Sequence, residues 1–188
     1  NGLPERWKSQ ERFAIGELGF GTGLNFCETW RVWQGLAQPK ARLHFVSFEL
    51  YPMERGSIAK ALARWPQIEA QRQALTDRWP DRPEEIVEID MDDGVRLTVV
   101  CGDALTRLAS IDLVFDAWYL DGFAPSRNGA MWSGELMQAV FDHTRDVGSF
   151  ATYAAAGFVR RNLTAAGFVV ERRPGFAGKR EMLCGQKR

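Results

Sequence analysis

The sequence predicts an α/β fold: a mostly parallel, doubly wound sheet that ends in an antiparallel hairpin. Short apolar segments with strand character alternate with segments of helical spacing, and this alternation is typical of a parallel sheet covered by helices on both faces. The last two apolar segments follow each other without a helix between them, which predicts an antiparallel hairpin at the sheet edge. A length of 188 residues favours a single domain over residues 1–188.

Strands are predicted where short apolar runs end at glycine, proline or acidic residues. The first run begins at Phe13 and stops at the glycines that follow Leu18, and Asp92-Asp93-Gly94 predicts a hairpin turn between the third and fourth strands. The predicted strands are Phe13–Leu18, Leu43–Phe48, Ile86–Asp90, Arg96–Val100, Leu113–Tyr119, Ser149–Tyr153, Phe168–Arg172 and Glu181–Cys184.

Helices are predicted where apolar residues recur every three to four positions. Leu24, Cys27 and Trp30 step along the first helix, and Pro66 separates the second helix from the third. The predicted helices are Thr22–Leu36, Glu54–Trp65, Ile68–Trp79, Glu135–His143 and Gly157–Ala166. Ligands of open parallel sheets bind beyond the carboxyl ends of the strands, so the segments that follow strands are the candidate functional residues.

Composition excludes several classes of protein. The formal net charge is zero, but residues 157–188 hold eight Lys and Arg against two acids, which indicates either an anionic partner or a solvated basic edge. Three separated cysteines and two histidines lack metal-ligand spacing, which excludes a zinc site and favours a reducing cytoplasm. There is no signal peptide and no apolar run approaching the ~18 residues of a membrane span, and the sequence opens without an initiator Met.

A glycine-rich segment between the first strand and the first helix is a candidate cofactor loop. Gly19, Gly21 and Gly23 permit a tight turn and a close approach of ligand to backbone. A dinucleotide-binding fingerprint would place glycine where this chain has Leu24, so that pattern fails. The preceding acid, Glu17, suits a ligand with an ammonium and a sulfonium better than one with a pyrophosphate.

Two further acids follow strands. Glu49 can accept hydrogen bonds from both hydroxyls of a ribose, and Asp103 can accept one from an adenine amino group. Taken singly, the glycines are compatible with an ordinary turn, Glu49 with a helix cap or a solvated acid, and Asp103 with the N-cap of a helix that begins at Ala104. Acids at successive strand ends together with the glycines predict recognition of an adenosyl ligand.

The segment Leu120–Pro125 is a candidate acceptor loop at the end of a hydrophobic strand. An acid followed by an aromatic residue and a proline resembles the Asp/Asn-Pro-Pro-aromatic loop of amino-group methyltransferases. Asp121 can accept hydrogen bonds from an amine, and Phe123 can stack on a planar base or face a sulfonium. The alternative is a turn capped by Asp121 with Phe123 in the core. Asp116, on the same strand, is either a satisfied core acid or a group that supports the site.

Four motifs together resemble the methyltransferase domain of the bacterial tRNA-modifying MnmC family. They are Glu17–Phe26, Asp121–Trp132, Ala156–Arg161 and Gly175–Gly185, and the resemblance extends from about Gly2 to Gly185. It implies a class I, Rossmann-like methyltransferase fold with S-adenosylmethionine as the methyl donor. It also implies methylation of 5-aminomethyl-uridine, usually 2-thiolated, to 5-methylaminomethyl-uridine at the wobble position of tRNA.

The resemblance assigns expected roles to individual residues. Catalytic candidates are Asp121 and Phe123. Cofactor-binding candidates are Glu17, Gly19, Phe20, Gly21, Thr22, Gly23, Asn25, Glu49, Gly102, Asp103, Ala104 and Asp121. Candidates for binding the anticodon stem-loop are Arg127, Arg160, Arg161, Phe176, Lys179 and Arg180. The aromatic residues Phe20, Phe123 and Phe176 are expected to line a pocket for the unstacked wobble base.

The chain departs from the family in two respects. The family usually reads Ala-Lys-Asn-Pro-Asp-Met-Trp where this chain has Ser126–Trp132, so a basic residue is kept as Arg127 and an acid is lost. Members also have about a further strand pair before the first residue of this chain, and many carry a flavin-dependent domain after it that removes a carboxymethyl group. We therefore expect methyl transfer alone here, with a separate or fused oxidase partner.

Other functions remain open at this point. A small-molecule amine methyltransferase or an aminopropyltransferase would share the cofactor and acceptor loops, although the basic C-terminal segment disfavours it. A non-catalytic module that binds tRNA or an adenosyl ligand is disfavoured by the intact acceptor loop. An NAD-dependent dehydrogenase is disfavoured by Leu24 and by the lack of a second nucleotide-binding half.

Overall fold

The computed structural model describes residues 1–91, 94–122, 128–175 and 180–188. The chain divides into two compact units. The three-stranded unit comprises Gly2–Phe13 and Phe20–Gly102, and the five-stranded unit comprises Asn1, Ala14–Gly19 and Asp103–Arg188. The chain passes between the units at Gly19-Phe20 and at Gly102-Asp103, which are two of the predicted cofactor-binding segments. A single domain over residues 1–188 stays a prediction.

The three-stranded unit has the strand order β3-β4-β2. Its strands are β2 (Arg42–Glu49), β3 (Ile86–Asp90) and β4 (Val95–Cys101). β2 and β4 are parallel, with Glu49 opposite Cys101 at their carboxyl ends. β3 and β4 are antiparallel, which confirms the predicted pairing, while Asp92 and Asp93 of the turn lie outside the described residues.

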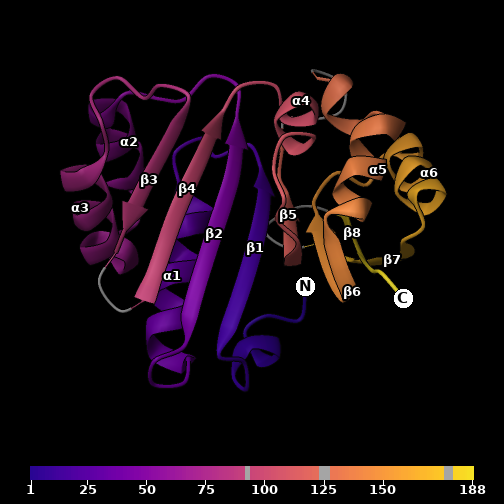
Figure 1. Cartoon of the computed structure of the whole chain (residues 1–188), viewed down its shortest axis with the longest axis horizontal. Helices are drawn as coiled ribbons and strands as arrows, with labels where there is room; N and C mark the ends of the chain where they lie inside the picture. Colours follow the sequence, from indigo (N-terminus) through magenta and orange to yellow (C-terminus); the bar gives the residue numbers. More distant parts are fainter. Residues whose placement is uncertain (92–93, 123–127, 176–179) are drawn as a thin grey trace. The chain divides into compact units, whose positions relative to one another are not determined.

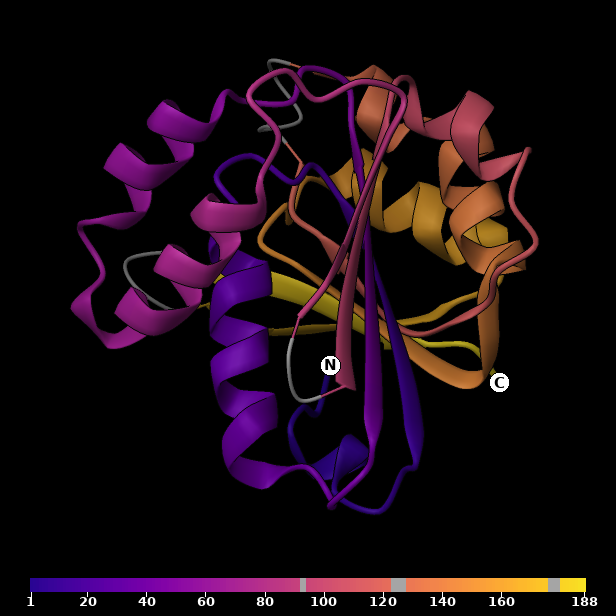
Figure 2. The same ribbon diagram turned by 60° about the vertical axis from the view of Figure 1, so that its left-hand side comes forward.

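Three α-helices lie on one face of this sheet (Figure 2). The helices are α1 (Leu24–Leu36), α2 (Arg55–Leu62) and α3 (Glu69–Arg78), and the 3₁₀ turns are η1 (Glu5–Trp7) and η2 (Pro66–Ile68). α1 begins at Leu24 rather than at Thr22 because Gly23, with φ +77°, still has a left-handed turn conformation. Its buried Phe26, Trp30 and Trp33 form the core of the unit together with side chains from β2.

The five-stranded unit has the strand order β1-β5-β6-β8-β7. Its strands are β1 (Arg12–Leu18, of which Ala14–Leu18 belong to this unit), β5 (Phe115–Leu120), β6 (Thr144–Thr152), β7 (Val169–Pro174) and β8 (Glu181–Gln186). β1, β5 and β6 are parallel, and β8 is antiparallel to both β6 and β7. The predicted C-terminal hairpin is therefore confirmed, with β7 as the edge strand.

β6 begins at Thr144, earlier than the predicted Ser149. The register against β5 shifts between Phe115 and Ala117, and the extra residues of β6 include Val147 at φ +57°. An irregularity of this kind adds residues to one strand of a pair and interrupts the alternation of side chains, so the sequence pattern does not reveal it.

Helix α5 (Gly134–Asp142) lies between α4 (Ala104–Leu108) and α6 (Gly157–Ala166), as Figure 1 shows, and the short η4 (Ala130–Trp132) precedes it. Asp116 of β5 accepts a hydrogen bond from the backbone N–H of Ala14 at 2.7 Å and lies 3.4 Å from the guanidinium of Arg145. Of the two roles considered for Asp116, these contacts favour the satisfied structural acid.

Gly16 of β1 gives a first testable prediction. A β-carbon at this position would lie 2.6 Å from ring atoms of the fully buried Trp118. We expect Gly16→Ala to lower the free energy of unfolding by about 1–3 kcal/mol, because a closely packed core cannot admit another methyl group without strain. Urea denaturation measures the change. Gly134→Ala, where a β-carbon meets no atom within 4 Å, is the control and should unfold at the wild-type midpoint.

Candidate active site

In the three-stranded unit, Glu49 at the end of β2 contacts the glycine loop. Its Oε2 accepts a hydrogen bond from the Gly21 N–H at 2.9 Å, and its Oε1 accepts one from the Tyr51 N–H at 2.9 Å. Two residues predicted from separate segments thus lie together. A carboxylate offers about four lone-pair positions, so each oxygen keeps capacity for a further donor such as a ribose hydroxyl.

The Phe20 ring has a different environment from the one expected. It stacks on Trp79 with centroids 5.1 Å apart and planes 6° apart, and Phe20 is only 3% exposed. The ring lies in the core of the three-stranded unit and not at a base-binding surface, which corrects the expectation that it lines a pocket for the wobble base. A β-carbon on Gly23 would approach this ring within 2.8 Å, so the loop requires glycine there.

Trp79, the last residue of the predicted helix Ile68–Trp79, makes contacts in this region that the sequence did not predict. Its indole N–H donates to the Met53 carbonyl at 3.0 Å, and its own carbonyl accepts from Arg55 at 2.8 Å. Trp79 therefore ties the segment after β2 to the Phe20 side of the glycine loop. The remaining predicted residues of this unit, Thr22 and Asn25, are half-buried, and the Gly102 N–H donates to the Glu49 carbonyl at 2.9 Å.

In the five-stranded unit, the ends of β1 and β5 lie side by side. The two strands are parallel with Leu18 opposite Leu120, so Gly19 and Asp121 each follow the last residue of a neighbouring strand. Gly19 has φ +90°, and a β-carbon there would lie 3.7 Å from the Gly122 Cα. Glu17 is 1% exposed, whereas Asp121 is exposed to solvent. Within this unit, the structure thus places Gly19, the first glycine of the candidate cofactor loop, beside Asp121 and Gly122 of the candidate acceptor loop.

Asp103 caps helix α4, the alternative considered from the sequence. Its Oδ1 accepts hydrogen bonds from the N–H of Thr106 at 3.0 Å and from the Thr106 hydroxyl at 2.9 Å. This bonding satisfies a donor of the first helical turn and fixes the side chain. The neighbouring Ala104 is buried. The contact of Asp103 with adenine stays a prediction.

The predicted tRNA-binding residues are only partly described. Phe123, Arg127, Phe176 and Lys179 lie outside the described residues. Arg160 and Arg161 are exposed on α6, and Arg180 is exposed directly before β8. A β-carbon on Gly157 would lie 3.3 Å from an Arg161 guanidinium nitrogen, so this side chain folds back over the start of α6.

The structure also reveals two residues near the acceptor loop that the sequence did not single out. The Asn162 side chain of α6 donates to the Trp132 carbonyl at 2.7 Å, and Trp132 follows the loop region. Tyr153 directly follows β6 and is 45% exposed. A tyrosine at the carboxyl end of the predicted strand Ser149–Tyr153 was a usable signal, because ligands of parallel sheets bind beyond the strand ends.

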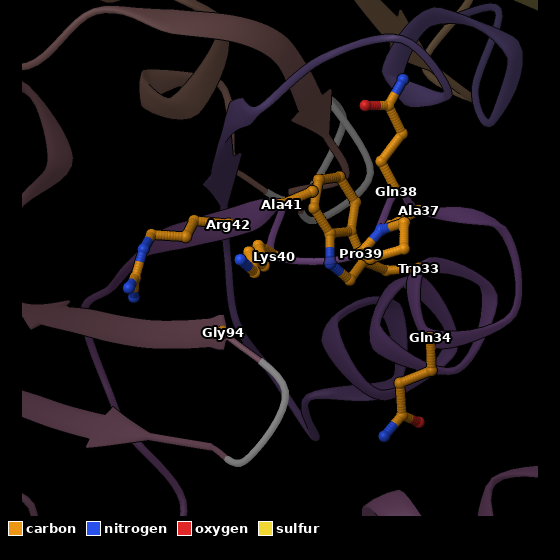
Figure 3. A pocket seen from close by; sticks show the side chains of 9 residues that line it. All are labelled: Trp33, Gln34, Ala37, Gln38, Pro39, Lys40, Ala41, Arg42 and Gly94. Atoms are coloured by element: carbon orange, nitrogen blue, oxygen red, sulfur yellow. The ribbon is translucent and has the colours of Figure 1, made fainter.

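A cavity of about 690 Å³ lies elsewhere in the three-stranded unit (Figure 3). Its lining includes Trp33 of α1, Lys40 and Arg42 at the start of β2, and Gly94 before β4. It is therefore at the amino ends of these parallel strands, whereas Glu49 and Gly102 are at their carboxyl ends. None of the predicted site residues lines it.

Metal-dependent and thiol-dependent chemistry find no support in the described ranges. No three His, Cys, Asp or Glu side chains there are placed to hold a metal ion. Burial raises the pKa of the Cys27 thiol to about 12, so this thiol is protonated at neutral pH and is a poor nucleophile. Within the same ranges every helix is too short or too polar to cross a bilayer.

Comparison with known proteins identifies the fold. The structure matches MnmC2 from Aquifex aeolicus with a TM-score of 0.77 at 22% identity, covering 98% of this chain and 55% of that one. It also matches the S-adenosylmethionine-bound amino pentose methyltransferase CalS10 from Micromonospora echinaspora with a TM-score of 0.52 at 15% identity, covering 97% of this chain and 86% of that one. The predicted class I methyltransferase fold is confirmed.

Sequence comparison finds more similar relatives. The chain is 44% identical to a tRNA 5-methylaminomethyl-2-thiouridine biosynthesis bifunctional protein MnmC from Chromohalobacter salexigens, and 46% identical to the protein of the same name from Cupriavidus metallidurans. These matches cover 99% and 97% of this chain but only 27% and 28% of the relatives. The profile of the S-adenosyl-L-methionine-dependent methyltransferase family matches residues 66–188. The chain therefore belongs to the family of S-adenosyl-L-methionine-dependent methyltransferases.

Proposed function

We propose that this chain transfers a methyl group from S-adenosylmethionine to the amine of 5-aminomethyl-uridine, with or without 2-thiolation, at the wobble position of tRNA. The observation that carries the proposal is the position of Asp121 beside Gly19, where an amine held by the acid faces the candidate cofactor loop. The relatives named above support the choice of tRNA, although this chain spans only about 28% of their length.

The residues present fit the cofactor. Glu49 offers a carboxylate to the ribose hydroxyls, held in place by the Gly21 and Tyr51 N–H groups. Glu17 and Gly19 in the five-stranded unit offer an acid and an open backbone to the methionine part, which carries an ammonium. Asp103 is proposed to accept a hydrogen bond from the adenine amino group. These groups distinguish an adenosyl ligand with a positive charge from a pyrophosphate-bearing dinucleotide.

At the acceptor side, Asp121 holds the amine by accepting its hydrogen bonds and helps to remove a proton. When bound, S-adenosylmethionine supplies the methyl group, whose bond to sulfur breaks as the bond to the amine nitrogen forms. Phe123, which lies outside the described residues, is proposed to stack on the substrate base. Orientation of two reactants in this way accounts for a large part of many enzymatic accelerations, up to about 7–11 kcal/mol in ideal cases.

The anticodon stem-loop is proposed to contact the basic segment. Arg160, Arg161 and Arg180 are exposed, and no ion pair with an acid is found for them among the described residues. By contrast, Arg172 and Arg173 of β7 lie near Glu181 and Glu171. We place the reaction in the cytoplasm and propose that a fused or separate flavin-dependent oxidase supplies the aminomethyl substrate.

The function is tested by transfer of labelled methyl to tRNA that carries 5-aminomethyl-uridine at the wobble position, with the unmodified tRNA as control. Incorporation into the modified tRNA alone is the expected result. Cofactor binding without incorporation into either tRNA would instead point to another amine, such as a small molecule. Failure to bind S-adenosylmethionine would contradict the proposed use of these loops.

Charge reversal on α6 tests the tRNA-binding surface. We expect Arg160→Glu with Arg161→Glu to weaken binding of all tRNAs and to reduce the slope of log affinity against log salt by about two, because each lost phosphate contact lowers it by about one. Binding titrations at several salt concentrations measure both effects. Lys60→Glu on α2 with Arg64→Glu just after it makes the same change in net charge at exposed positions and is the control. An unchanged salt slope would remove α6 from the binding surface.

A further inference from the structure

Tyr153 occupies the strand end next to Asp121. β5 and β6 are parallel and pair with a regular register over their last residues, with Trp118 opposite Phe150 and Tyr119 opposite Ala151. Continued for two residues, this register places Asp121 opposite Tyr153. Each of them directly follows the last residue of its strand. The tyrosine is therefore at the same sheet edge as the acid that the proposed function assigns to the amine.

The backbone around Tyr153 is held while its ring remains accessible. Thr152 is 3% exposed, and its hydroxyl accepts a hydrogen bond from the Ala154 N–H at 2.9 Å, which fixes the turn that carries Tyr153. The residue as a whole is 45% exposed. Among the described aromatic residues of the five-stranded unit, it is the one that is exposed, whereas the others are buried or half-buried. A fixed backbone with an open ring is suited to contact a ligand.

The chain that follows Tyr153 leads directly to the basic part of α6. Helix α6 begins at Gly157, and its first turns carry Arg160 and Arg161. A short segment between the end of β6 and the first turns of α6 thus carries both an exposed aromatic residue and two exposed arginines. Sequence-specific RNA recognition commonly stacks an unstacked base on an aromatic side chain and binds neighbouring phosphates with arginine.

We propose that Tyr153 is a substrate-contacting residue whose ring stacks on the pyrimidine base that carries the amine held by Asp121. The inference rests on the proposed function and extends it to the recognition of the base. The ring provides a flat apolar surface that costs little conformational entropy to order, since a tyrosine has few rotatable bonds. The ligand that this ring would bind is a planar nucleobase in a single-stranded loop.

Three variants test the proposal by steady-state methyl transfer to the aminomethyl-uridine tRNA. Tyr153→Ala removes the ring, and we expect KM for tRNA to rise about 5- to 100-fold, as for other base-stacking aromatics. Tyr153→Phe keeps the ring and should restore KM to near the wild-type value. Leu113→Ala is the control, because Leu113 is similarly exposed, at 37%, but lies before the amino end of β5, whereas Tyr153 follows the carboxyl end of the parallel strand β6.

Two further measurements separate recognition from folding and from the proposed function. Affinity for S-adenosylmethionine and the urea midpoint should be unchanged in Tyr153→Ala; a parallel loss of both would mean that the side chain is structural. Equal defects in the Phe and Ala variants would assign the effect to the hydroxyl and overturn stacking. Fluorescence anisotropy of an anticodon stem-loop gives affinity without turnover, so Tyr153 is still tested if the wild type transfers no methyl group. An unchanged affinity in Tyr153→Ala would then refute the proposal.

Discussion

Asp121→Ala is expected to lower kcat for methyl transfer by about 10²- to 10⁴-fold, the range typical of a lost general base. The side chain is exposed at the end of β5, next to the end of β1 that leads into Gly19. Without the carboxylate, the amine loses the group that accepts its hydrogen bonds and helps to remove its proton. Affinity for S-adenosylmethionine should remain close to that of the wild type, which isothermal titration calorimetry measures.

Asp112→Ala is the matched control for this variant. Asp112 is also an exposed aspartate, but it lies before β5 and so at the other end of the strand. We expect wild-type kcat for it. Asp121→Asn keeps an oxygen that can accept a hydrogen bond while it loses the charge, and should give an intermediate rate. Wild-type turnover in Asp121→Ala would refute the assigned role.

Glu49→Ala is expected to weaken binding of S-adenosylmethionine by about 10²- to 10⁴-fold. Two hydrogen bonds to a charged carboxylate are worth about 1.5–3 kcal/mol each, and the variant would lose both of the proposed ribose contacts. The Gly21 and Tyr51 N–H groups also lose their acceptor, which loosens the glycine loop. Titration calorimetry with S-adenosylmethionine and with its demethylated product measures the change.

The control for Glu49 is Glu54→Ala. Glu54 is an exposed acid shortly after the same strand, at the N-cap of α2, where its side chain makes no capping hydrogen bond. Its loss should leave cofactor affinity unchanged. If Glu49→Ala bound the cofactor as tightly as the wild type, Glu49 would be a structural acceptor for the loop and no more.

Local patterns in the sequence were sufficient for most of the secondary structure and for a prediction of the chemistry of the loops. The hairpin between β3 and β4, helix α6 and the C-terminal pair β7 and β8 all follow from apolar periodicity and turn residues close together in the chain. The glycines after β1 and the acids Glu49 and Asp121 could likewise be selected as candidate site residues from the sequence alone. Backbone freedom and charge are properties of single residues and need no knowledge of the partners.

The environment of each side chain was decided by tertiary structure. The Phe20 ring is an example: an aromatic residue in a glycine loop suggested a base-binding surface, yet the distant Trp79 stacks on it and buries it. Asp116 similarly gains its role from Ala14 and Arg145, which lie far from it in sequence. No local pattern predicts such contacts, because they depend on which segments the sheet and helices bring together.

The register between strands likewise needs the folded chain. A strand pattern marks where Tyr153 lies along β6, but only the pairing of β5 with β6 places it opposite Asp121. The irregularity near Val147 shifts that pairing, and its interruption of the alternation hides the first residues of β6 from a strand pattern. The sequence by itself determined the class of fold and the cofactor, and it predicted the reacting groups, since these depend on residue types at strand ends. The tertiary structure decided which of these groups are neighbours, because non-local hydrogen bonds set the strand register.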